Sequence, residues 1–207
     1  MELSVSILNA KDKIEMINLL NKTDISYIHL DVMDGNFVSQ KSLPLEEIIE
    51  LSKVSDKKLD VHLMMVNPLE NIEKIKDLDN IEYITIHLEI DKDIKNILKK
   101  IKDYGYKTGL SIKPNTDIKE LLPYLDYLDL VLLMTVEPGL GGQQFMIKSA
   151  ERLKRLKQIV NENIKIEVDG GINNITIKEV RESDIAVVGS YITTSENPID
   201  KINGLLV

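Results

Sequence analysis

The sequence contains no cysteine among its 207 residues, and it contains no run of 18 or more apolar residues. The absence of cysteine excludes a disulfide framework and a thiolate metal site, and it agrees with the reducing cytoplasm as the expected compartment. The absence of a long apolar run predicts no membrane span. Residues 1–4 also lack the basic region that opens a secretory signal, so we expect no membrane partner.

Negative charge exceeds positive charge. Acidic residues outnumber basic ones by 34 to 26, which gives a formal net charge of -8 at pH 7. This balance argues against a nucleic-acid partner. An anionic substrate remains compatible with it, because backbone N–H groups can bind a phosphate locally. No charge pattern indicates a foreign protein partner, and we expect a homo-oligomer.

Short β-rich runs alternate with helical patterns along the whole chain. The predicted strands are residues 3–8, 27–35, 59–64, 82–87, 107–112, 128–134, 165–168 and 185–188. Helices are predicted over 11–20, 91–103 and 148–160, and from about residues 44, 67, 117, 174 and 198. Eight strand–helix units predict an α/β fold, a single-domain (β/α)8 TIM barrel over residues 1–207, with an open doubly wound sheet as the alternative. In the first helix, Ile14, Ile17 and Leu20 share the spacing of one buried face.

Residues 27–35 have an unusual strand pattern. Strict alternation places His29, Asp31 and Met33 on one face and apolar residues on the other. In a TIM barrel the active site lies at the carboxyl ends of the strands, where the following strands add His62 and Asp169. His29, Asp31, His62 and Asp169 form a set suited to one divalent ion such as Zn, Fe(II), Mn or Co.

Two carboxylates at one metal ion also supply the groups for proton transfer next to a carbonyl. A bound ion stabilises an enediolate, and Asp31 and Asp169 lie on strands well separated around the barrel. One would remove a proton and the other would return it on the opposite face, which inverts the carbon. The same two residues could instead serve as metal ligands only.

Methionines and glycines recur at the same strand ends. Met33, Met64 and Met134 stand at positions expected to point into the pocket, where an apolar lining would exclude water. Glycine-rich segments follow the last three predicted strands and let backbone N–H groups approach a phosphate. They contain Gly141, Gly142, Gly170, Gly171, Gly189 and Ser190.

Taken together, these residues resemble the ribulose-phosphate 3-epimerase family. The matching stretches run in family order over residues 6–9, 29–35, 60–64, 134–145, 168–172 and 188–190. The resemblance implies a metal-dependent epimerase that interconverts D-ribulose 5-phosphate and D-xylulose 5-phosphate in the pentose phosphate pathway. It implies that Asp31 and Asp169 are the acid/base pair, that Ser6 and His62 contact the substrate, that the three methionines line the pocket and that the glycines and Ser190 hold the phosphate.

The chain departs from the family pattern at three places. Lys11 stands where the family commonly has Asp, Leu140 stands where it commonly has Phe, and residues 36–43 form a shorter segment without the usual Gly-Pro. None of these positions is a candidate metal ligand. They concern the closure of the pocket over a substrate.

Other functions are compatible with parts of this pattern. An epimerase of a six-carbon ketose phosphate, such as allulose 6-phosphate, would share every proposed ligand. The decarboxylase and hexulose-phosphate synthase group shares the barrel but carries a lysine in the Asp-x-Lys-x-x-Asp motif, where this chain has Val32-Met33-Asp34 after Asp31. A non-catalytic metal-bearing barrel would bind a ketose phosphate without exchanging its C3 proton.

Overall fold

A computed structural model describes residues 1–206 of the chain. Nine strands form one sheet. They are β1 (Glu2–Ser6), β2 (Tyr27–Asp34), β3 (Lys41–Ser42), β4 (Lys58–Met64), β5 (Ile81–His87), β6 (Lys107–Ile112), β7 (Leu130–Met134), β8 (Lys165–Asp169) and β9 (Ile185–Val188).

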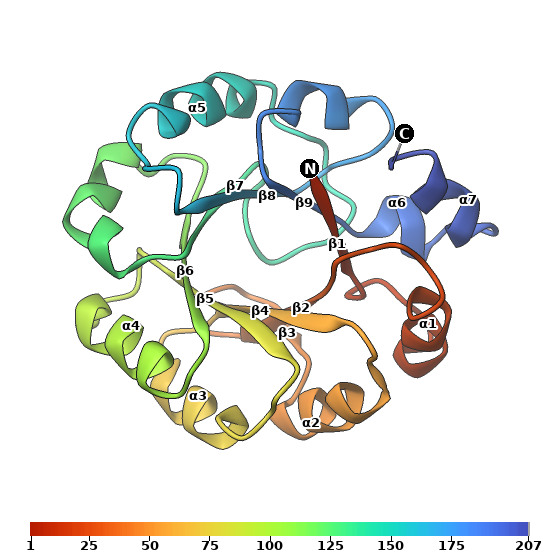
Figure 1. The fold of residues 1–207 in the computed structure, drawn as a ribbon, viewed down its shortest axis with the longest axis horizontal. Helices are drawn as coiled ribbons and strands as arrows, with labels where there is room; N and C mark the ends of the chain where they lie inside the picture. Colours follow the sequence, from red (N-terminus) through yellow and green to blue (C-terminus); the bar gives the residue numbers. More distant parts are fainter. Residues whose placement is uncertain (207) are drawn as a thin grey trace.

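The sheet closes on itself (Figure 1). Parallel neighbours follow one another in the order β1, β9, β8, β7, β6, β5, β4 and β2, and parallel pairing of β1 with β2 completes the ring. The short strand β3 is an antiparallel addition to the carboxyl end of β2, and the sequence pattern did not predict it. The closed ring confirms the predicted TIM barrel and rejects the open sheet.

Helices surround the barrel in Figure 1. They are α1 (Lys13–Leu20), α2 (Leu45–Val54), α3 (Leu69–Ile75), α4 (Ile94–Asp103), α5 (Lys148–Lys157), α6 (Ser190–Thr193) and α7 (Pro198–Asn203), with the 3-10 helices η1 (Ile118–Tyr127) and η2 (Thr176–Val180). The sequence pattern missed the short α6. The helix expected from residue 117 is a 3-10 helix that contains Pro123, a residue that cannot donate an α-helical hydrogen bond.

Two helices begin later than predicted because aspartates cap them. The side chain of Asp12 accepts the backbone N–H of Glu15, and that of Asp93 accepts the N–H of Asn96. An aspartate at such a position lies just before the first helical residue. Helices α1 and α4 therefore start at Lys13 and Ile94, not at residues 11 and 91.

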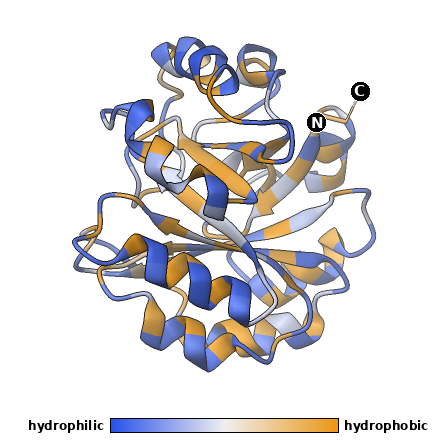
Figure 2. Cartoon of the chain, turned by 60° about the vertical axis from the view of Figure 1, so that its left-hand side comes forward, coloured by the Kyte–Doolittle hydropathy of each residue, from blue (hydrophilic) through white to orange (hydrophobic). Residues whose placement is uncertain are grey.

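The barrel wall separates two groups of buried side chains. Ile28, Leu30 and Val32 of β2 belong to the large core between the strands and the outer helices, as alternation predicted. Tyr27 belongs to a smaller cluster that includes Leu130 of β7. In Figure 2 the central strands are largely hydrophobic, while the helices carry both hydrophobic and hydrophilic residues.

One predicted core position is wrong. Ile17 and Leu20 of α1 are fully buried, but Ile14 is 47% exposed. Ile14 is the second residue of α1, two positions after the capping Asp12, and the buried residues of this helix are Ile17 and Leu20. Within residues 1–206, no helix is both long and apolar enough to cross a membrane.

Candidate functional site

A cavity opens at the carboxyl ends of the barrel strands, where the active site of a TIM barrel lies. Most residues predicted for the site line it. They are Ser6, Asp31, Met33, Met64, Met134, Gly141, Gly142, Asp169, Gly170, Gly171, Gly189 and Ser190. His29 and His62 are fully buried and are not among the residues that line the cavity, although both rings lie beside Asp31, which does line it.

The four candidate metal ligands come together at the base of this cavity. One ligand atom from each of His29, Asp31, His62 and Asp169 lies within 4.8 Å of the other three. Oδ1 of Asp31 is 3.4 Å from Nε2 of His29 and 3.5 Å from Nδ1 of His62. Nδ1 of His62 is 4.0 Å from Oδ2 of Asp169.

These separations agree with a shared ion. Tetrahedral ligands at metal bond lengths of about 2.1 Å lie roughly 3.4 Å apart. Nε2 of His29 and Nδ1 of His62 are buried and have no hydrogen-bond partner within the described residues. A buried nitrogen without a partner costs free energy unless another group satisfies it. The four residues could therefore hold a divalent metal ion.

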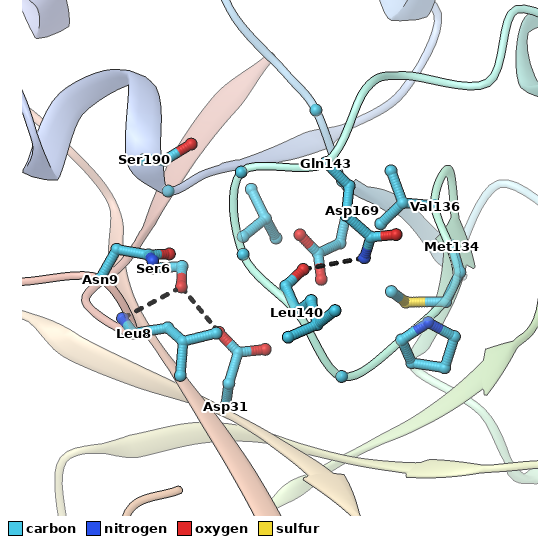
Figure 3. Close-up of a pocket in the computed structure, with 18 of the residues that line it drawn as sticks. Ser6, Leu8, Asn9, Asp31, Met134, Val136, Leu140, Gln143, Asp169 and Ser190 are labelled. Carbon is cyan, nitrogen blue, oxygen red and sulfur yellow. Dashed lines mark hydrogen bonds between the residues drawn. The ribbon is translucent and has the colours of Figure 1, made fainter. Parts of the chain in front are cut away.

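The two aspartates have different surroundings. Burial acts to raise the pKa of Asp31, but the positive charge of nearby His29 lowers this pKa well below its usual value. Ser6 donates a hydrogen bond of 2.6 Å to Oδ2 of Asp31, the oxygen turned away from the histidines. Burial, together with the charge of Asp31, raises the pKa of Asp169 to about 6. Figure 3 shows Asp31 and Asp169 entering the cavity from different parts of the barrel.

Three residues beneath the ligands were missed in the sequence. Nδ1 of His29 lies 2.6 Å from Oδ2 of Asp60, and Ser4 donates a 3.0 Å hydrogen bond to the same oxygen. Glu167 is fully buried near this group. The alternation of strands contained the signal, because Ser4, Asp60 and Glu167 each stand two residues before a predicted site residue. They form the next layer inside the barrel.

The wall of the cavity depends on glycine at a close approach. Gly171 has φ of +66°, and a Cβ atom there would lie 2.4 Å from the backbone nitrogen of Phe145. Only glycine fits this position without displacing the backbone. In Figure 3, Ser190 lies in the upper part of the cavity view and Asp31 in the lower part. Gly139, Leu140 and Gln143 also line the cavity and belong to the glycine-rich segment that the sequence indicated for phosphate. Sequence reasoning gave no role to the remaining wall residues, which are Leu8, Asn9, Val136, Glu137, Pro138, Ile172 and Val187.

Fold and site together define a TIM-barrel protein with a candidate metal centre at the carboxyl ends of its strands. The chain belongs to the ribulose-phosphate 3 epimerase family, whose model matches residues 2–193. This match confirms the resemblance seen in the sequence motifs and makes the chain an enzyme of that family.

Two relatives and one solved structure illustrate the similarity. A ribulose-phosphate 3-epimerase of Aquifex aeolicus is 37% identical over 183 residues, or 86% of this chain and 82% of that protein. The cytoplasmic isoform of ribulose-phosphate 3-epimerase of Oryza sativa subsp. japonica is 34% identical over 185 residues, 86% of this chain and 80% of that protein. The structure of 3-hexulose-6-phosphate synthase from Salmonella typhimurium shares the fold, with a TM-score of 0.71, 18% identity and coverage of 99% of this chain and 96% of that one.

Proposed function

We propose that the chain is a metal-dependent epimerase that interconverts D-ribulose 5-phosphate and D-xylulose 5-phosphate, a reaction of the pentose phosphate pathway. The observation that carries this proposal is the pair of unpartnered histidine nitrogens beside two aspartates at the base of the cavity. The names of the relatives agree with this substrate pair. We propose residues 1–207 as one catalytic domain.

His29, Asp31, His62 and Asp169 would hold the ion through the atoms that face one another across the site. Imidazole and carboxylate ligands without thiolate suit Zn, Fe(II), Mn or Co. When bound, the ion would stabilise the negative charge of an enediolate on the sugar. In its absence, Asp60 and Asp31 raise the pKa of His29 above its usual value against the effect of burial, so a proton competes with the ion for this ring.

Asp31 and Asp169 are the proposed proton carriers. One carboxylate takes the proton from C3 of the ketose phosphate, and the other gives a proton to the opposite face of the same carbon. Return on the opposite face inverts C3 and leaves no net change in protons. The raised pKa of Asp169 supports this role, because a group that titrates near neutral pH can both accept and donate a proton.

The upper wall of the cavity would hold the rest of the substrate. Met33, Met64 and Met134 are buried, and their apolar side chains would keep water away from the reacting carbon. Ser6 would contact the sugar from the cavity wall, and His62 would contact it from the base of the cavity, beside Asp31. The phosphate would be bound by the hydroxyl of Ser190 and by backbone N–H groups. These N–H groups belong to Gly141, Gly142, Gly170, Gly171, Gly189 and Ser190.

Two further properties belong to this proposal. We propose the cytoplasm as the compartment, supported by the absence of cysteine and by the name of the rice relative. We also propose a homo-oligomer as the working form, without nucleic acid as a partner, in keeping with the acidic net charge.

The test is incubation with ribulose 5-phosphate in deuterated water, followed by NMR at C3. We expect deuterium to enter C3 of both ribulose 5-phosphate and xylulose 5-phosphate, and we expect chelation to stop this exchange until a divalent ion is returned. Allulose 6-phosphate in a parallel sample distinguishes the five-carbon from the six-carbon substrate. Binding of ribulose 5-phosphate without exchange at C3 would show a non-catalytic barrel and reject the proposal.

A further inference from the structure

A buried chain of hydrogen bonds leads from His62 away from the cavity. Nε2 of His62 lies 2.9 Å from Nε2 of His87, and the centroids of the two rings are 5.0 Å apart, so the rings meet through these nitrogens. Nδ1 of His87 lies 3.1 Å from Oε2 of Glu89. The other oxygen of Glu89 accepts hydrogen bonds from the backbone N–H of Lys113 at 2.7 Å and from the hydroxyl of Thr116. We call His62, His87 and Glu89 the histidine relay.

The direction of every hydrogen bond in the relay follows from the charge of Glu89, at the end farthest from the cavity. An ionised carboxylate only accepts hydrogen bonds. Although burial acts against it, hydrogen bonds from His87, Thr116 and the Lys113 backbone lower the pKa of Glu89 to about 2. Nδ1 of His87 must therefore donate to Glu89. A neutral His87 ring has a single N–H, which is the one at Nδ1, so its Nε2 accepts.

The remaining proton position is then determined. Two Nε2 atoms that face each other at 2.9 Å share one proton, and His87 has none at that nitrogen. The proton belongs to His62, whose Nε2 donates to His87. Nδ1 of His62 is left with a bare lone pair, and it is the atom that lies beside Asp31 and Asp169 without a hydrogen-bond partner of its own.

We propose that His87 and Glu89 are positioning residues that keep the proton of His62 on Nε2 and so prepare Nδ1 as a metal ligand. This inference rests on the metal site of the proposed function. Groups that hydrogen-bond to a metal-bound histidine set its tautomer and ring orientation, and their loss typically weakens metal binding by about 10- to 100-fold.

The segment that follows β2 shields the relay. The centroids of the Phe37 and His87 rings are 4.6 Å apart. Nζ of Lys113 lies over the ring of Phe37, 4.0 Å from its centroid. His87 is fully buried as a result. Residues 36–43 thus supply an aromatic ring, that of Phe37, which covers His87.

NMR of the metal-free wild-type protein tests the relay directly. The chain has only three histidines, so the nitrogen resonances can be assigned with single histidine variants. We expect His62 to carry its proton on Nε2 and His87 to carry its proton on Nδ1. A proton on Nδ1 of His62 would overturn the inference.

The variant Glu89→Gln tests the consequence for the metal. The Gln side chain has one acceptor oxygen and one donor NH2 group, so it cannot accept on both sides as the two oxygens of Glu89 do. If its NH2 group faces His87, every hydrogen bond of the relay changes direction. We expect the proton of His62 to move to Nδ1 and calorimetric titration with Zn2+ to show about 10- to 100-fold weaker binding. The matched control is Glu82→Gln at the amino end of β5, the strand that ends just before Glu89, where Glu82 pairs with Lys107. We expect wild-type zinc affinity from this control.

Three outcomes separate the possibilities. Equal zinc affinity in Glu89→Gln and Glu82→Gln, with the wild-type histidine pattern in both, would overturn the inference. If Glu89→Gln fails to fold, Thr116→Val removes only one hydrogen bond to Glu89 and should weaken zinc binding by a smaller factor; unchanged binding would contradict the relay. A wild-type protein that binds no divalent ion would reject the proposed metal site, while the tautomer of His62 would still decide the relay.

Discussion

Asp60 and His29 form a buried pair directly beneath the candidate metal centre. Oδ2 of Asp60 lies 2.6 Å from Nδ1 of His29, and Nε2 on the other side of the ring lies 3.4 Å from Asp31. A carboxylate at Nδ1 holds that nitrogen protonated and directs Nε2 toward the site. The candidate centre thus depends on a residue that cannot itself reach the cavity.

Asp60→Asn should weaken metal binding. An amide in place of the carboxylate removes the charge that holds Nδ1 of His29 protonated, and we expect about 10- to 100-fold weaker binding of Zn2+ by calorimetry. Ser4→Ala is the graded control, because it removes only the 3.0 Å hydrogen bond from Ser4 to the same Asp60 oxygen. An Asp60→Asn protein that binds zinc no more weakly than Ser4→Ala would show that Asp60 does not orient His29.

Asp169→Asn should reduce turnover far more than substrate binding. The amide cannot carry the proton that the proposed mechanism passes through Asp169, so we expect kcat to fall by about 10²- to 10⁴-fold. The measurement is steady-state kinetics at saturating metal, with metal content determined on the same sample. Turnover close to that of the wild type would contradict the two-carboxylate mechanism.

Substitutions of Ser190 should act on the phosphate end of the substrate. Ser190→Ala removes a hydroxyl that lines the cavity, and Ser190→Asp places a negative charge against the phosphate. We expect both to raise KM, with the larger increase for the aspartate, and to leave kcat nearly unchanged. An effect confined to kcat would assign Ser190 to the chemical step instead.

Two isoleucines of α1 should differ in their contribution to stability. Ile17 is fully buried and Ile14 is 47% exposed. We expect Ile17→Ala to lower the free energy of unfolding by about 2–5 kcal/mol, because it leaves a cavity in the core. Ile14→Ala should change it by no more than about 0.5 kcal/mol. Urea denaturation measures both values. Equal losses would show that the buried face of α1 has been assigned incorrectly.

Much of the fold was readable because its signals are local. The eight parallel strands appear as short β-rich runs, and strand β6 (Lys107–Ile112) and strand β9 (Ile185–Val188) have the predicted bounds. Errors arose where tertiary packing overrides the local pattern. Ile14 has helical spacing but no neighbouring core, and β3 is a two-residue strand that exists only because β2 lies beside it.

The sequence likewise predicted part of the candidate site. Alternation identified the residues that point into the barrel, and it placed His29 and Asp31 on one face correctly. The supporting residues were not recognised, because Asp60 and Glu89 look like ordinary acidic residues in a linear chain. Their role depends on hydrogen bonds to His29 and His87.

The sequence by itself determined the barrel, the family and the set of side chains that face its interior, since strand periodicity and motif order are properties of the linear chain. Only the tertiary structure decided which of these side chains share a site and which nitrogen of each histidine faces it. Closing the ring brings together strands that are far apart in sequence, and the proton positions follow from partners such as Asp60, His87 and Glu89 that the ring places beside the ligands.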